Sequence, residues 1–173
     1  MVETLVAIAI LMVSIVGPLT ISQKAYNAGI YARDQVTASY LAQDAVEFIK
    51  NIRDNNKLAS PPRDWLYGLT NTGLCNASSN TCIVDTLFGD PSGLSSNYVS
   101  SCNSGGGADA CRLFIGDNGY THSPSGTTPT KYIRYFYITK TVDKEATLTV
   151  VVKWTTGIDN MIVYESRIFD IVK

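Results

Sequence analysis

Charge and histidine are scarce in this sequence, and their scarcity argues against several classes of function. Charged residues make up 17% of the 173 residues, the formal net charge is -1, and there is 1 histidine. This balance gives no general electrostatic attraction to nucleic acid or to an anionic membrane. Between Trp65 and Thr130 the only lysine or arginine is Arg112, so this region is a poor phosphate-binding surface. We therefore expect no specific nucleic-acid partner.

A recognisable catalytic constellation is also lacking. The single histidine, His122, lies in "GYTHSPSG" without a paired cysteine or acid close in sequence, and we interpret it as a solvated loop residue. The segment "CNSGGGADAC" has the glycines of a phosphate loop but lacks its lysine and its following helix. The segment "GDNG", residues 116–119, lacks the alternating acidic ligands of a calcium loop and is predicted to be a turn. The sequence therefore predicts neither an enzyme nor a cofactor-binding protein.

Four cysteines lie in the polar middle of the chain, in "CNASSNTC" and "CNSGGGADAC". Zinc ligands usually come in pairs two to four residues apart, often with histidine, and here six and eight residues intervene, so we expect no metal site. Four cysteines allow three pairings, and the sequence alone does not choose among them. Because short loops close at low entropic cost, we expect Cys75 bonded to Cys82 and Cys102 bonded to Cys111. Disulfides imply an oxidising compartment outside the cytoplasm.

A long uncharged run opens the chain. No charged residue occurs from Thr4 to Gln23, and twenty helical residues cover about 30 Å, the thickness of a bilayer's hydrocarbon core. The run lacks the basic n-region and the cleavage site of a secretory signal peptide, and it continues into a longer helical pattern. We therefore predict a membrane or filament-core segment over residues 1–24. Glu3, at the mouth of this run, is a candidate functional residue because a carboxylate is costly to immerse in lipid.

Residues 3 to about 56 are predicted to form one helix. Its first third is apolar on all faces, and at Gly17-Pro18 the proline removes an amide donor, so we expect a kink or local unwinding there. Over residues 25–57 the helix becomes amphipathic, with charged residues on the faces outside one apolar stripe. The predicted stripe consists of Leu41, Ala45, Phe48, Ile49 and Ile52.

Residues 58–130 are rich in glycine, serine, asparagine and proline and are predicted to be a variable loop region. The apolar islands "WLYGL", "CIVDTLF" and "CRLFIG" are predicted to be brief strands or helical turns. A loop region of this length is uncommon in a compact domain unless it is functional or braced, and the two disulfides would brace it. Reduction is therefore expected to loosen this region while the helix and the C-terminal strands stay folded.

Residues 131–173 contain three runs rich in β-branched and aromatic residues. The clearest, "ATLTVVVKW", alternates between one face that can pack on a core and one that can meet water. The residues predicted to face the core are Ala146, Leu148, Val150, Val152 and Trp154, and those predicted to meet water are Thr147, Thr149, Val151, Lys153 and Thr155. Polar turns separate the runs, so an antiparallel β-meander is predicted, and the amphipathic part of the helix is the natural partner for its apolar face. The predicted fold class is α+β, with the loop region between the helix and the meander.

This order of features resembles that of the type IV pilins and pseudopilins. The most specific signature is "MVETLVAIAIL", in which Met1, Val2 and Glu3 match positions of the family's processed N-terminus. That N-terminus has a phenylalanine, a small polar residue, two apolar residues, a glutamate and then an apolar run, so the match implies two residues ahead of Met1. Pro18 resembles the family's helix-breaking proline. The stretch "TVVVKWTTG" is similar to a strand and turn of many such pilins.

The resemblance implies a structural subunit of a type IV pilus filament, and we favour a major pilin over a minor one. The helix would be held in the cytoplasmic membrane before assembly and buried in the core of a homopolymer afterwards, with prepilin peptidase and the pilus assembly machinery as partners. Glu3 would pair with the N-terminal amine of a neighbouring subunit, and Gly17-Pro18 would let the helix melt locally. The filament would lie outside the cell and serve adhesion or twitching motility, through a surface ligand that the sequence does not identify.

Two alternatives stay open. One is a pseudopilin of a type II secretion or DNA-uptake system, and the other is a single-pass, membrane-anchored binding domain that does not polymerise. Without its first 24 residues or so, the chain is expected to be soluble and monomeric, because the stripe from Leu41 to Ile52 already has a partner in the sheet.

Overall fold

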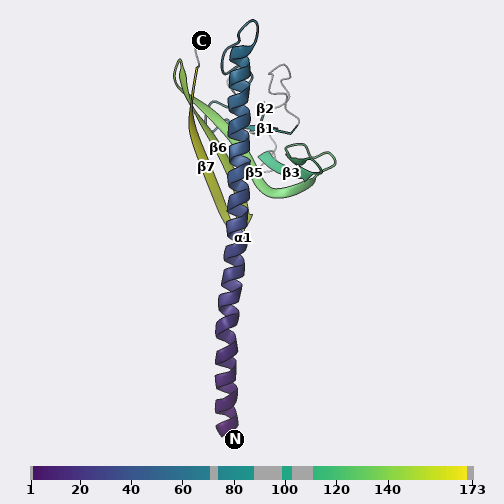
Figure 1. Ribbon diagram of the computed structural model, residues 1–173, viewed down its shortest axis with the longest axis vertical. Helices are drawn as coiled ribbons and strands as arrows, with labels where there is room; N and C mark the ends of the chain where they lie inside the picture. Colours follow the sequence, from purple (N-terminus) through teal and green to yellow (C-terminus); the bar gives the residue numbers. More distant parts are fainter. Residues whose placement is uncertain (1, 71–73, 88–98, 103–110, 171–173) are drawn as a thin grey trace. The chain divides into compact units, whose positions relative to one another are not determined.

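The computed structural model describes residues 2–70, 74–87, 99–102 and 111–170. Within these ranges the chain forms one α-helix and a seven-stranded sheet (Figure 1). The elements, in chain order, are α1 (Val2–Leu58), β1 (Cys82–Val84), β2 (Val99–Ser101), β3 (Arg112–Gly116), β4 (Gly119–Thr121), β5 (Thr128–Val142), β6 (Glu145–Thr156) and β7 (Ile158–Phe169). The predicted fold class, α+β with a long N-terminal helix and an antiparallel sheet, is confirmed.

The chain divides into two compact units, Met1–Thr37 and Ala38–Lys173. The described part of the first unit is α-helix alone. The second unit, called the head below, contains residues 38–58 of α1 and the whole sheet.

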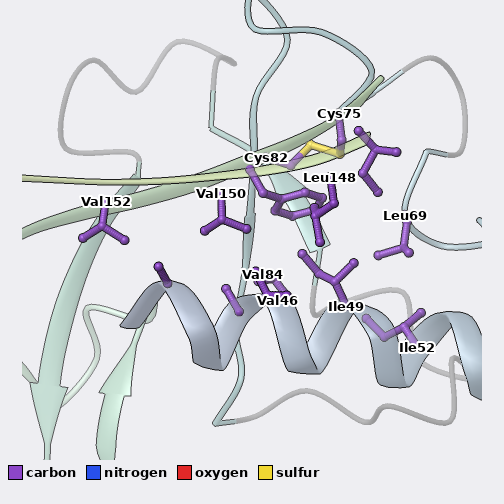
Figure 2. Packing of buried hydrophobic residues seen from close by; sticks show 14 of the residues in the cluster. Val46, Ile49, Ile52, Leu69, Cys75, Cys82, Val84, Leu148, Val150 and Val152 are labelled. Carbon is purple, nitrogen blue, oxygen red and sulfur yellow. A yellow bond between two sulfur atoms is a disulfide. The ribbon is translucent and has the colours of Figure 1, made fainter. Parts of the chain in front are cut away.

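The hydrophobic core of the head lies between its helical residues and one face of the sheet. The buried helical side chains recur every three or four positions, which is the spacing of one helical face. They are Ala38, Leu41, Ala42, Ala45, Val46, Ile49 and Ile52. Figure 2 shows Ile49 of α1 pointing toward Leu148 of the sheet. The predicted apolar stripe is therefore confirmed, with Phe48 only partly buried at its margin.

The three C-terminal strands form the predicted antiparallel meander. A turn at residues 143–144 joins β5 to β6, and Gly157 joins β6 to β7. Gly157 has a φ of 76°, in the left-handed region that glycine adopts without steric cost. The residues of β6 predicted to face the core are all buried, namely Ala146, Leu148, Val150, Val152 and Trp154.

The other face of β6 is less exposed to solvent than its sequence indicates. Thr149 and Val151, predicted to meet water, are 2% and 4% exposed. The β5–β6 register places Tyr137 opposite Thr149 and Tyr135 opposite Val151, and bulky side chains directly opposite across a strand pair shield smaller ones. The alternation prediction is therefore wrong at these two positions.

The region predicted to be loops, residues 58–130, contributes four short strands to the same sheet. β1 pairs with β2 and β5, and β3 pairs with β4 and β5, all antiparallel. The islands "CIVDTLF" and "CRLFIG" thus contain strands, "WLYGL" forms turns, and "GDNG" holds the predicted turn between β3 and β4. β5 pairs with β6 along one edge and with β1 and β3 along the other, so it joins the loop-derived strands to the meander.

Candidate functional site

The first part of α1 presents a continuous apolar surface. Its large apolar residues up to position 21 are each more than half exposed, and they are Val2, Leu5, Val6, Ile8, Ile10, Leu11, Met12, Val13, Ile15, Val16, Leu19 and Ile21. By length and composition this helix could cross a membrane. A contiguous apolar surface of this kind marks a site of contact with lipid or with protein.

Glu3 lies in the first turn of α1 and is exposed. A carboxylate in this position interacts favourably with the positive end of the helix dipole. It is the only ionisable side chain ahead of Lys24, so any apolar environment that takes up the first part of α1 must also accommodate this one charge. Its pairing with an amine of another subunit stays a prediction.

The helix runs through Gly17 and Pro18 without interruption. Of the two outcomes expected there, local unwinding is therefore absent, and a kink stays a prediction. Because Pro18 has no amide, it cannot donate the usual helical hydrogen bond to the carbonyl of Ser14. Local hydroxyl bonds flank the proline: Ser14 Oγ donates to the carbonyl of Leu11, and Thr20 Oγ1 donates to that of Gly17, both at 2.8 Å. A Cβ added at Gly17 would meet no atom within 4 Å. Gly17 and Pro18 therefore lower the local helix propensity without serving a packing role in the described residues.

The Cys75–Cys82 disulfide belongs to the hydrophobic core of the head. Cys75 is 1% exposed and Cys82 is fully buried, and their Cα atoms lie 5.2 Å apart (Figure 2). Cys82 begins β1 opposite Phe136, and the amide of Ile138 donates to the carbonyl of Cys75 at 2.7 Å. The bridge, expected to brace the loop region, therefore also connects that region to β5.

The second disulfide joins Cys102, just after β2, to Cys111, just before β3, with their Cα atoms 5.4 Å apart. Both half-cystines are buried, and the amide of Cys102 donates to the carbonyl of Thr81 at 3.1 Å. The two pairings expected from short-loop closure are thus the pairings that the structure contains. The residues enclosed by this second bridge, 103–110, lie outside the described ranges.

A buried arginine that the sequence analysis does not single out connects the helix to two strands. Arg134 Nη1 donates to Asp44 Oδ2 at 2.9 Å and to the carbonyl of Leu41 at 3.0 Å, and Nη2 donates to the carbonyl of Val84 at 2.9 Å. The Arg134 side chain is 1% exposed and that of Asp44 is 51% exposed. Burial lowers the pKa of Arg134, and the hydrogen bond and charge of Asp44 oppose that shift. A buried cation is tolerated only when it is paired and hydrogen-bonded in this way.

The alternation of buried residues along β5 shows how Arg134 could have been recognised from the sequence as a buried residue. Tyr132, Phe136 and Ile138 are all buried, and Arg134 occupies the one alternate position between Tyr132 and Phe136. Because residues two apart share a face of a strand, an arginine in this series has to enter the core.

His122 lies in the bend after β4 but is only partly exposed, so the interpretation of it as a solvated loop residue is right about the loop and wrong about the exposure. Its Nδ1 lies 3.1 Å from the carbonyl of Arg112, and a carbonyl accepts, so the neutral ring donates from Nδ1. Burial, followed by the positive charge of Arg134, lowers the pKa of His122 to about 3, against opposing contributions from Asp85 and from the Arg112 hydrogen bond. Nε2 is buried without a hydrogen-bond partner among the described residues. His122 is therefore neutral at physiological pH.

Within the described ranges, no group of three or more histidine, cysteine, aspartate or glutamate side chains is placed to hold a metal ion. The four cysteines are all engaged in disulfides. The feature that stands out in these ranges is the exposed apolar surface along the first part of α1.

Comparison of the chain with protein-family models, with curated proteins and with solved structures found no match in any of the three. Any assignment of this chain to a class of proteins therefore depends on its own architecture, which combines an α+β head with a long apolar helical segment.

Proposed function

We propose that this chain is a structural subunit of a type IV pilus-like filament that polymerises through the first part of α1. The observation that carries the proposal is the run of exposed apolar side chains from Val2 to Ile21, with Glu3 at its start. The head builds a separate core around residues 38–52 of the same helix. The head can therefore be folded while the apolar segment is still available for another partner.

The apolar segment drives assembly by removing its side chains from water. Each fully buried large aliphatic side chain contributes about 1.5–3 kcal/mol, so a bundle of such helices from several subunits is strongly favoured. Before assembly, the same segment is held in the cytoplasmic membrane, where prepilin peptidase and the assembly machinery meet it. After assembly, the head faces outward on an extracellular filament that serves adhesion or twitching motility, and we favour the role of major pilin.

Glu3 selects the register of the bundle. An unpaired charge inside an apolar bundle costs about 3–5 kcal/mol, so only those arrangements that bring a cation to Glu3 are stable. The N-terminal amine of a neighbouring subunit is the cation that a parallel bundle of these helices supplies at this depth. Glu3 thus contributes specificity, and the surrounding aliphatic residues contribute the driving force.

The proposal is tested by Glu3→Gln in the full-length protein, with Glu47→Gln as the matched control. Both changes remove one exposed carboxylate from the same helix, and Glu47 lies within the head. We expect Glu3→Gln to reduce the yield of filaments seen by electron microscopy at least about tenfold, while Glu47→Gln leaves it unchanged. Mass spectrometry identifies the subunit in the filaments. Wild-type yield of correctly processed Glu3→Gln filaments would contradict the role given to Glu3.

The second candidate is a single-pass membrane protein that anchors the head and does not polymerise. The observation that favours it is the same helix, which is long and apolar enough to cross a membrane. The two candidates separate when cells that express the chain are sheared. A filament subunit is recovered in the sheared fraction as polymers, whereas an anchored domain stays with the membrane. A pseudopilin forms only short filaments, and the length distribution of the sheared polymers distinguishes it from a pilin.

A further inference from the structure

Strand β7 forms an open edge of the sheet. Among the described residues it pairs with β6 along its whole length, from Ile158 to Phe169, and with no other strand. Figure 1 shows β7 as the outermost strand next to β6. The backbone amides and carbonyls that point away from β6 are available to a further strand, which is how extended segments add to a sheet edge.

Three features that protect a sheet edge, proline, lysine and a β-bulge, are missing from β7, although the strand carries the charged residues Asp159, Glu165 and Arg167. At the opposite end of the sheet, β2 and β4 are only 3 residues long, and short edge strands are themselves a form of protection. Large apolar side chains on β7 are also exposed, namely Ile158, Met161, Val163, Tyr164 and Phe169.

We propose that β7 binds the β7 strand of a second copy of this chain in an antiparallel pair centred on Val163. In this register, Asp159 of each copy lies opposite Arg167 of the other, so two pairs of opposite charge form. Ile162 lies opposite Tyr164, and Val163 lies opposite itself. Directly opposed pairs of opposite charge and of apolar side chains are the pairs that stabilise antiparallel strands.

The neighbouring registers are worse. A pair centred on Tyr164 places Asp159 opposite Phe169 and loses both charge pairs. A pair centred on Ile162 places Asp159 opposite Glu165, and like charges directly opposite each other are destabilising. A shift of the pairing by one residue sets the core-facing side chains of one sheet beside the outward-facing side chains of the other. A pair centred on Ser166 also forms two pairs of opposite charge, Glu165 with Arg167, but it pairs only residues 163–169 of each strand, whereas the pair centred on Val163 includes residues 158–168. The charge pattern and the length of the paired segment together therefore favour the register centred on Val163.

Both charged groups are accessible to the second copy. The Arg167 side chain is 74% exposed, and its Nη1 lies 3.3 Å from Glu145 Oε1. Asp159 is exposed and accepts a hydrogen bond from Thr155 Oγ1 at 2.8 Å. Asp159, Val163 and Arg167 lie on one face of the strand, because they are separated by even numbers of residues.

This contact joins two copies and cannot be extended to a third, so it differs from the contacts that build a filament. The two-fold axis passes midway between the two copies of Val163, perpendicular to the sheet, so the pair joins two heads and uses the β7 edge of both. A filament needs an open, head-to-tail contact. The inference therefore rests on the sheet alone. Because the two-fold axis also reverses the helical part of the second head, this dimer and a parallel bundle of the same two chains exclude each other. The inference revises the expectation of a monomeric head, which considered the apolar stripe of the helix and not the edge of the sheet.

Cysteine cross-linking in the full-length protein in detergent micelles tests the register. Opposed Cα atoms in an antiparallel pair lie about 4.5–5.5 Å apart, within reach of a disulfide, so Val163→Cys should form a dimer under mild oxidation. Met161→Cys is the matched control, because the two copies of residue 161 would be four positions apart along the strands, or about 13 Å. Peptide mapping without reduction identifies the new bridge and shows that the four native cysteines keep their partners.

Charge reversal on the Val163→Cys background tests the two ion pairs. Asp159→Arg and Arg167→Asp should each lower the dimer yield about threefold or more, and the double variant should restore it. Equal cross-linking of the Met161→Cys and Val163→Cys variants, or failure of the double charge variant to recover, would overturn the proposal. If Val163→Cys itself does not fold, a mixture of Asp159→Cys and Arg167→Cys proteins tests the same register, since only the mixed dimer is expected. Cross-links to other proteins alone would also overturn it.

Discussion

The two parts of α1 use the same kinds of side chain for opposite purposes. Up to residue 21 the large aliphatic residues occur on every face and are each more than half exposed. In residues 38–52 the aliphatic residues form one stripe, which is buried against the sheet, and charged residues occupy the other faces. A helix with one apolar stripe has its partner on one side, whereas a helix that is apolar all round needs partners on every side. The head supplies the first kind of partner, and a membrane or a bundle of helices would supply the second.

The comparison predicts its largest effect for a matched pair of truncations, Ile49→Ala and Ile10→Ala. Ile49 is fully buried in the head, so its truncation should lower the free energy of unfolding of the head by about 2–5 kcal/mol. Ile10 is 66% exposed, so its truncation should change that quantity by less than about 0.5 kcal/mol. Denaturant unfolding followed by the fluorescence of the buried Trp65 and Trp154 measures both. A comparable loss for Ile10→Ala would show that the first part of α1 stabilises the head.

The two disulfides should contribute unequally to the head. By loop-closure entropy alone, each bridge contributes about 2–3 kcal/mol, because the two loops differ little in length. The Cys75–Cys82 bridge also packs in the core that covers the helical stripe. Removing it as Cys75→Ala with Cys82→Ala should therefore cost more stability than removing Cys102 and Cys111 in the same way. Thermal unfolding of the two double variants provides the measurement, and equal losses would contradict a core role for the first bridge.

A change of pH should have a smaller effect on the free energy of unfolding, and this effect should be confined to the head. The pKa of His122 is about 3 in the folded chain and 6.5 in the unfolded chain, so below pH 6.5 the unfolded chain binds a proton that the folded chain does not. The stability associated with the neutral ring is therefore complete above pH 6.5 and is lost progressively as the pH falls toward 3. The loss between neutral pH and pH 5 should be about 2 kcal/mol.

His122→Asn removes this titration and provides the control for the pH effect. The difference in unfolding free energy between the wild type and this variant, followed from pH 7.5 to pH 5, isolates the contribution of the histidine from that of the carboxylates. Parallel pH profiles would show that His122 is accessible to protons in the folded head. The helicity of the first part of α1 should not respond to pH over this range, because its residues from Thr4 to Gln23 carry no titratable charge.

Periodicity explains which elements could be predicted from the sequence. The helix and the three C-terminal strands are long enough to show a 3.6-residue or a 2-residue repeat, and their turns carry polar residues or glycine. The strands β1 and β2 have 3 residues each, which is too short for a repeat to show. Their placement depends on pairing with residues far along the chain, such as Cys82 with Phe136, and no local pattern encodes that pairing.

The same distinction applies to the candidate sites. Glu3, Gly17 and Pro18 could be chosen from sequence because each interrupts an otherwise uniform apolar run. His122 could not be assigned correctly, because its environment is created by Arg112 and Arg134, which come from two other strands. The open edge of β7 was equally hidden, since strand order is a property of the whole sheet.

The contacts of the buried Arg134 can form only late in the synthesis of the chain. Arg134 bonds to Asp44 across a separation of 90 residues, and strands β6 and β7 are synthesised later still. At about 5–20 residues per second, a ribosome needs roughly 5–20 s to travel from the first partner to the second. During that interval, the stripe from Ala38 to Ile52 has left the ribosome without the strands that cover it. If the first helical turns deliver the chain to a membrane, an uncovered apolar stripe follows behind them, and a chaperone or translation coupled to insertion would then be needed to protect it.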